Sequence, residues 1–429
     1  MQAFARPPIP VVVLQHAQES AALRHVRSVL VRAPHVRLHQ LQRLDERIAA
    51  HLDGLAVAGA YGAGICSAAL ERPGAGEVFA AASCALEAHD AAALDRLIAL
   101  AGALPEARRG LLSALGWASA AQLKGIVSPL LGAADPLRRA LGLGACRLHH
   151  ADPGAVLANA LGDADLALRL EAVQCAAVLG RTALLPLVQA AAADADTALQ
   201  FQAARAACLL GERASALEGL SAIAQGEGAH AGLALATVLQ ASPFARAQGL
   251  VRRLAQAGRN TPARQRRLVS ACGLLGDTHF VPWLIDLMAD DKVAQHAGEA
   301  FSLITGADLA ALDLERKPPP GLDAGPNDDP QDDNVALDED ESLPWPERDR
   351  VQRWWQTQAP EMPAGARYFI GAPPAPEHLT RVLREGFQRQ RIAAARLLTL
   401  QHPGTPLFAT AAPAWRQQRR LLPAMAAAR

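Results

Sequence analysis

Two stretches of the chain, Asp163–Gly180 (DADLALRLEAVQCAAVLG) and Asp194–Gly211 (DADTALQFQAARAACLLG), repeat each other at a spacing of 31 residues. Both begin with Asp-Ala-Asp, place leucine and alanine at matching positions and end in Leu-Gly. A shift of 96 residues, about three such units, carries Leu179-Gly180 onto Leu275-Gly276. A period of this size indicates a protein built from stacked structural repeats.

The first half of one unit predicts a helix. Asp165 can cap it by accepting a hydrogen bond from the orphan backbone N–H groups of the first turn. Leu168, Ala172 and Leu179 recur at helical spacing and form one apolar stripe. Gly180 follows the stripe and can adopt the left-handed conformation that ends a helix.

The second half of the unit predicts another helix, through Leu184, Leu187 and Val188 to Ala191. Pro186 is compatible with it because it falls in the first turn. Two short helices cannot bury their apolar stripes alone, so each unit needs neighbours. This pattern resembles the short bacterial HEAT repeats, and the resemblance implies a right-handed α-solenoid. Repeat arrays offer extended surfaces to partners and seldom a deep catalytic pocket.

Composition supports an all-α protein. Of 429 residues, 51% are hydrophobic and 4% aromatic, and no alternation typical of strands is sustained. The formal net charge is zero, which argues against a nucleic-acid-binding protein. No apolar run of about 18 residues predicts a membrane span, and no signal peptide opens the chain. Six cysteines stand singly in apolar stretches, as expected of buried thiols in a reducing, cytoplasmic compartment.

The pattern predicts four segments. Residues 1–75 form an N-terminal helical cap, with one helix over Val11–Arg32, a second over Leu38–Leu52 ended by Gly54, and a third that runs to Leu70. Residues 76–306 form the repeat array, residues 307–346 a Pro-rich acidic linker, and residues 347–429 a small C-terminal helical domain. Asp and Glu fill the linker between Asp323 and Glu341 without a basic residue. We expect this acidic stretch to lie against arginines.

Aromatic and basic residues gather in the C-terminal segment, where 13 arginines stand against 5 acidic residues. Trp354 and Trp355, with Arg389 and Arg391, are the candidate partner-binding residues, because tryptophan and arginine dominate interaction hot spots. The alternative is that the tryptophans form the small core of this segment.

Motifs of catalysis and metal binding fail on spacing. The acidic stretch lacks the order of an EF-hand, and His149-His150 with Asp152 has no further ligand at metal-site spacing, which favours a helix-end role. Gly59, Gly62 and Gly64 are not followed by the Lys-Ser/Thr of a phosphate-binding loop. No nucleophile elbow and no HExxH motif occurs. We therefore expect no catalytic residue, no metal, no cofactor and no small-molecule substrate.

Longer motifs at both ends resemble one bacterial family of HEAT-repeat proteins encoded beside type VI secretion genes. The motifs are Ala33–His35, Leu44–Arg47, Ala50–Leu55, Ala297–Gly306, Leu343–Pro346, Arg353–Trp355, Arg367-Tyr368 and Gln388–Arg391. The resemblance implies association with the secretion apparatus and supplies no reaction.

These observations lead to the hypothesis of a cytoplasmic, non-enzymatic adaptor or scaffold that binds a protein partner, such as an effector or spike component. One alternative is an immunity protein that binds a cognate toxin. Another is a lyase-type enzyme of the kind that some short HEAT arrays support, which a cluster of charged residues in one concave pocket would favour.

Overall fold

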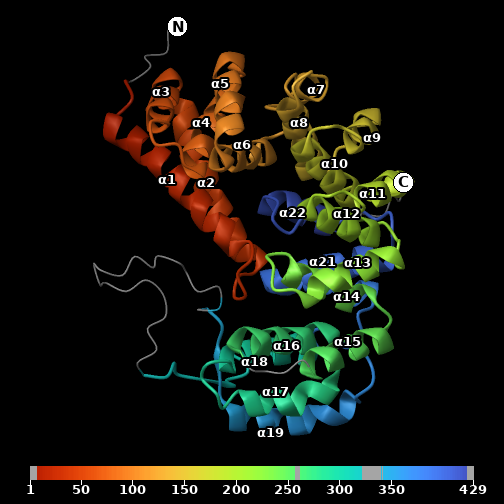
Figure 1. Cartoon of the computed structure of the whole chain (residues 1–429). Coiled ribbons are helices and arrows are strands. Elements are labelled where there is room, and N and C mark those ends of the chain that lie inside the picture. The colour runs from red at the N-terminus through yellow and green to blue at the C-terminus, as the bar shows by residue number, and fades with distance from the viewer. Residues whose placement is uncertain (1–6, 257–260, 321–339, 341, 423–429) are drawn as a thin grey trace, which may run out of the picture. The chain divides into compact units, whose positions relative to one another are not determined.

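The computed structural model describes residues 7–256, 261–320, 340 and 342–422. Over these residues the chain forms 22 α-helices, three short 3₁₀ helices and one antiparallel pair of two-residue strands (Figure 1). The expectation of an all-α protein is confirmed. Most of the acidic stretch, Asp323–Glu341, lies outside the described residues, and only Asp340 of its charged positions is described.

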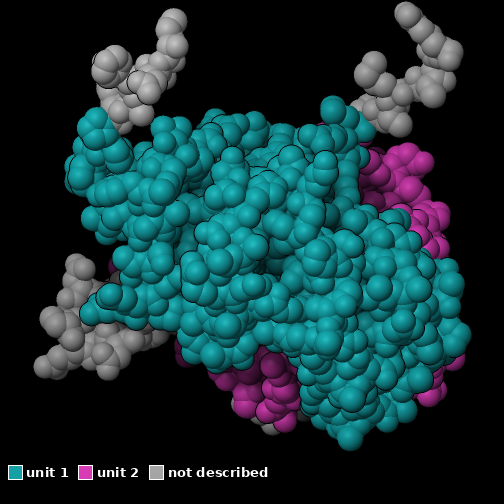
Figure 2. All heavy atoms as spheres, turned by 90° about the horizontal axis from the view of Figure 1, so that it is seen from above, with its two compact units in different colours: residues 1–32, 36–202, 406–429 teal, residues 33–35, 203–405 magenta. Residues whose placement is uncertain are grey.

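The chain divides into two compact units (Figure 2). Unit 1 comprises residues 1–32, 36–202 and 406–429, and unit 2 comprises residues 33–35 and 203–405. Residues 347–429, which the sequence predicts to form one C-terminal domain, are divided between the units: most pack with the later repeats, and the last helix packs with the N-terminal region.

The elements described in unit 1 are helices. Its helices are α1 (Pro10–Leu30), α2 (Leu38–Ala58), α3 (Ala60–Ala69), α4 (Ala75–Glu87), α5 (Ala91–Ala103), α6 (Pro105–Trp117), α7 (Val127–Leu131), α8 (Pro136–His149), α9 (Ala155–Leu161), α10 (Leu166–Val178), α11 (Leu185–Ala191) and α22 (Ala414–Leu421). The long α1 runs beside α2 and α4 (Figure 1). Helix α12 (Thr197–Leu209) continues from unit 1 into unit 2.

Unit 2 combines helices with the strand pair. Its elements are α13 (Ser215–Gln225), α14 (Ala231–Ala241), α15 (Phe244–Gln256), α16 (Pro262–Leu275), α17 (Val281–Leu287), α18 (Ala294–Thr305), β1 (Glu315–Arg316), β2 (Trp345–Pro346), α19 (Arg348–Gln358), α20 (Pro376–Glu385) and α21 (Gln388–Gln401). Glu315 pairs with Pro346 and Arg316 with Trp345. This pairing brings together the two ends of the predicted linker.

The local chemistry of the repeat follows the sequence pattern. Asp165 caps α10 by accepting from the backbone N–H of Leu168 at 2.8 Å, and Asp196 accepts from Leu199 at the same distance. Gly180 has a φ of +67°, and Pro186 lies in the first turn of α11. The predicted cap, helix end and proline position are therefore all confirmed.

A ladder of arginine–aspartate pairs joins successive repeats. Nη1 of Arg139 donates to Asp163 at 2.9 Å, and Nη1 of Arg169 donates to Asp194 at 2.6 Å. Each aspartate also accepts from the backbone N–H two residues later, and this hydrogen bond is the main cause that lowers the pKa of both carboxyls. The first Asp of each Asp-Ala-Asp motif thus links its turn to the preceding repeat.

Two positions of the repeat stripe differ from the expectation. Of the two adjacent apolar residues of α11, Val188 is fully buried and Leu187 is exposed. Leu179 is half-buried, whereas its counterpart Leu210 is buried. The end of α10 therefore packs less tightly than the repeat pattern predicts.

Gly54 does not end the second helix, contrary to the prediction. Helix α2 continues to Ala58 and ends at Gly59, whose φ is +56°. A Cβ on Gly54 would lie 2.5 Å from Nε2 of His16, so this glycine makes room for the His16 ring of α1. In the sequence, a glycine that ends a helix and a glycine that makes room for a neighbouring side chain look alike, because both follow an apolar stripe.

The core of unit 2 includes the tryptophans of α19. Val351 and Trp355 pack with Leu284, Ile285 and Phe301, among other side chains of α17 and α18.

Among the described residues, no single helix has both the length and the apolar composition needed to cross a membrane, although α2 and α3, bent by 116°, pass that test as a pair.

Candidate functional site

The predicted partner-binding tryptophans belong mainly to this core. Trp355 is buried and Trp354 is half-buried. Both rings meet Phe301 edge to face, with centroids 5.8 Å away for Trp354 and 6.4 Å for Trp355. The alternative interpretation, that these residues form a core, is the one that the structure supports for Trp355.

Arg391 is the largest fully buried side chain of the described chain, with 0% exposure. Its Nε donates to the carbonyl of Leu383 at 2.7 Å, and its Nη1 donates to Oε1 of Gln388. Burial lowers its pKa to about 10. An incoming partner cannot reach this guanidinium, so the expectation that Arg391 contacts a partner does not fit. The guanidinium instead connects α20 and α21, because Leu383 belongs to α20 and Gln388 to α21.

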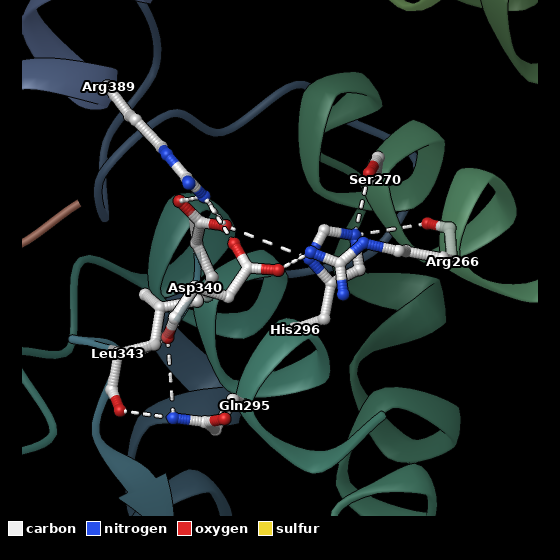
Figure 3. Close-up of polar contacts among 8 residues, drawn as sticks. Arg266, Ser270, Gln295, His296, Asp340, Leu343 and Arg389 are labelled. Atoms are coloured by element: carbon white, nitrogen blue, oxygen red, sulfur yellow. Dashed lines mark hydrogen bonds and ion pairs between the residues drawn. The ribbon is translucent and has the colours of Figure 1, made fainter. Parts of the chain in front are cut away.

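Arg389 lies in a polar cluster where α16, α18, α21 and the end of the acidic stretch meet (Figure 3). Its Nη1 donates to Glu299 of α18 at 2.8 Å and to Asp340 at 3.0 Å. Asp340 also pairs with Arg266 of α16. At the one charged position of the acidic stretch that is described, the expected pairing with arginine is therefore present.

A histidine stands beside these carboxylates. Nε2 of His296 lies 2.7 Å from Ser270 Oγ and 3.1 Å from the carbonyl of Arg266, and its Nδ1 lies 3.8 Å from Glu299 (Figure 3). Burial, and then the charge of Arg266, lower the pKa of His296 to about 4. The ring is therefore neutral near pH 7.

The arrangement of Ser270, His296 and Glu299 does not have the geometry of a catalytic triad. A general base needs a free Nε2 lone pair to take the serine proton. Here the carbonyl of Arg266 at 3.1 Å requires a proton on Nε2, so Nε2–H is the donor and Ser270 Oγ accepts a hydrogen bond from it. The distance of 3.8 Å from Nδ1 to Glu299 is also too long for a hydrogen bond that orients the ring.

His296, Glu299 and Asp340 offer three ligand atoms within 4.8 Å of one another, a spacing that a metal ion could use. Both carboxylates, however, already accept from Arg389, and Asp340 also pairs with Arg266. Two guanidinium charges balance two carboxylates and oppose a cation. The cluster therefore fits a structural clamp that holds Asp340 against α16 and α18.

His149 and His150 stand at a helix end, as the sequence predicts. His149 is the last residue of α8, and His150 is its C-cap with a φ of +55°. Nε2 of His149 contacts the carbonyl of Leu115 at 2.8 Å, and Asp152 pairs with Arg181. These side chains thus face separate partners.

The exposed surface of α1 carries the feature that sequence reasoning missed. Ile9, Val11, Val12 and Leu14, here named the α1 apolar face, are 63%, 69%, 41% and 43% exposed. Val13 and Ala17 on the opposite side of the helix are buried. The signal was present in the sequence as an apolar run on both faces of the first turns, since a helix that packs on one side only needs one apolar stripe.

Unit 1 also contains a cavity of about 690 Å³ between α2, α3, α4, α6 and α22. Trp117 and Trp415, whose ring centroids are 4.7 Å apart, lie in its wall with Cys84.

The Sγ atoms of Cys84 and Cys66 are 3.9 Å apart. None of the six cysteines, all of which are described, forms a disulfide, and five of them are buried, as expected from the sequence.

Comparisons of the chain with protein-family models, with curated proteins and with solved structures found no match.

Proposed function

We propose that this chain is a non-enzymatic adaptor or scaffold that binds a protein partner through the α1 apolar face. The exposure of Ile9, Val11, Val12 and Leu14 is the observation that carries the proposal. Exposed apolar side chains that gather on one element mark interaction surfaces, because their transfer from water drives association. Each of these side chains contributes on the order of 1–2 kcal/mol when a partner covers it.

The chemistry of the described residues supports a binding role over a catalytic one. The one histidine–serine contact has its proton in the wrong place for catalysis, and the charged cluster around Asp340 is paired internally. The exposed apolar side chains have no such internal role. An interface that uses them matches the helix-in-groove mode, in which a partner groove accepts apolar residues at helical spacing.

The proposed repeat architecture, compartment and partner class rest on the resemblance to HEAT-repeat proteins encoded beside type VI secretion genes. It suggests a short-repeat α-solenoid that acts in the cytoplasm and binds a secretion-system component, such as an effector or spike protein. The repeated Asp-Ala-Asp turns and the Arg–Asp ladder support the repeat interpretation.

The test uses two double variants of the full chain. Val11→Asp with Leu14→Asp removes the apolar face, while Gln15→Asp with Gln18→Asp adds the same charge at exposed positions of the same helix. The new carboxylates of the first variant lie near the positive end of α1, so the fold should persist. Circular dichroism of both variants checks this.

Wild type and the control variant should capture the same secretion-system protein from the native bacterium, and the apolar-face variant should lose it. Binding of the purified pair should then weaken by about a hundredfold or more, as the loss of two apolar contacts predicts. Equal capture by the apolar-face variant would remove α1 as the docking surface. Capture that contains no secretion component would remove the association with secretion.

A further inference from the structure

A second cavity of unit 1, of about 420 Å³, concentrates positive charge. Five arginines line it: Arg24 and Arg27 from α1, Arg32 from the turn after α1, Arg147 from α8 and Arg416 from α22. Among the described residues that line it, none carries a carboxylate. The volume lies within the range of small-ligand sites.

Two of these arginines are neutralised by carboxylates behind the wall. Nε of Arg27 donates to Asp45 at 2.5 Å, and Nε of Arg147 donates to Glu171 at 2.5 Å. These pairs fix the side chains in place. Among the described residues, no such pair with a carboxylate holds Arg24 or Arg416.

The acceptors of Arg24 and Arg416 in the described part of the chain are neutral. Nη2 and Nε of Arg24 donate to Ser113 Oγ at 2.8 and 3.2 Å. Arg416 donates from Nη1 and Nη2 to the carbonyls of Gly116 at 2.9 Å and Ala118 at 3.3 Å. Burial, and then repulsion by neighbouring arginines, lower the pKa of both groups. A bound anion would relieve this repulsion.

The rest of the wall is largely apolar. Phe79, Trp117, Leu148 and Leu407 line it, and the Phe79 and Trp117 rings meet edge to face at 6.1 Å. Nε2 of His150, which also lines the cavity, is buried and makes no hydrogen bond with the described residues. A ligand that fits this wall combines an anionic group with an apolar body.

We propose that this cavity binds a carboxylate carried by an apolar group. A carboxylate can accept charge-assisted hydrogen bonds from the guanidinium N–H groups that the neutral acceptors leave over, since each guanidinium has five N–H donors. A carboxylate carries one negative charge and so needs less counter-charge beside this apolar wall than a phosphate dianion does. The C-terminal end of a polypeptide with an apolar last residue is the source that we favour, and this choice of source rests on the proposed protein-binding function.

The experiment titrates the full chain by calorimetry with four probes: acetyl-Leu-Phe with a free carboxylate, its C-terminal amide, 3-phenylpropionate and inorganic phosphate. We expect acetyl-Leu-Phe to bind at least tenfold more tightly than its amide. Arg24→Met should weaken binding at least tenfold, because one charge-assisted pair is lost. Arg96→Met, at an exposed position of α5, should leave it unchanged.

A second variant guards against misfolding of Arg24→Met. Ser28→Phe places a ring in the cavity at a partly exposed position and leaves every arginine intact, so it should also abolish binding. Absence of carboxylate binding at millimolar concentration, equal binding of the amide, or binding of phosphate alone would overturn the proposal. Equal binding of 3-phenylpropionate and acetyl-Leu-Phe would retain the carboxylate site and reject the polypeptide source. None of these results depends on the α1 apolar face, whose residues do not line the cavity.

Discussion

Replacement of Leu168 by alanine tests whether the repeat stripe holds unit 1 together. Leu168 lies in the first turn of α10 and is 0% exposed. Leu168→Ala therefore loses the full transfer free energy of the removed atoms and leaves a cavity, which together lower the free energy of unfolding by about 2–5 kcal/mol. The matched control is Leu187→Ala in α11 of the same repeat. Leu187 is 42% exposed, so its truncation should change stability by about 0.5 kcal/mol or less.

Urea unfolding followed by circular dichroism at 222 nm measures both variants. The transition that reports unit 1 should shift to lower urea for Leu168→Ala and stay in place for Leu187→Ala. Equal shifts of the two variants would refute the assignment of Leu168 to the core and of Leu187 to the surface.

Three further predictions concern unit 2. The free energy of unfolding should fall as pH drops from about 6.5 toward 4, because the lowered pKa keeps His296 neutral in the folded chain while the unfolded chain takes up the proton; His296→Gln should flatten this slope. Arg391→Met should cost about 1–3 kcal/mol in thermal unfolding, since buried acceptors lose their donor, whereas Arg389→Met at the partly exposed cluster should cost about 0–1 kcal/mol. Gly276→Ala should destabilise strongly, because its φ is +78° and a Cβ would lie 2.0 Å from the carbonyl oxygen of Tyr368; Gly232→Ala, which has open space, should stabilise α14 instead.

The repeat could be predicted from the sequence because its signals are local. Asp165, Pro186 and Gly180 each act on the backbone within a few residues, and each is found in the expected role. A stripe such as Leu168 and Ala172 needs only helical periodicity to be recognised. The same logic fails at Leu187 and Val188, since adjacent apolar residues leave the rotation of a short helix undetermined.

The packing of the C-terminal segment depends on contacts far apart in the chain. The backbone N–H of Tyr368 donates to the carbonyl of Gly276, and that of Ile370 donates to Leu303. Leu407 makes the corresponding contact with Val178 in unit 1. Gly276 therefore has a second role, since its lack of a Cβ lets the backbone of Tyr368 approach the end of α16.

The candidate site was predicted from residue type, and residue type does not reveal burial. Arg391 and Arg389 lie two positions apart on α21, yet one is fully buried and the other joins a charged cluster. Asp45 is another case, because it is fully buried between Arg27 and the backbone N–H of Ala414. The valines at the start of α1 are a further case, because the sequence predicts their helix but not the exposure of Val11 and Val12.

Hydrogen exchange of the purified complex tests the central claim, that the α1 apolar face binds a protein partner. Amide exchange of residues 10–30 is measured by mass spectrometry in the free chain and with the secretion-system protein that wild type captures. The account predicts slower exchange in the first turns of α1, around Val11 and Leu14, and unchanged exchange there in the Val11→Asp, Leu14→Asp variant. Protection confined to other helices, with α1 exchanging as in the free chain, would contradict the claim.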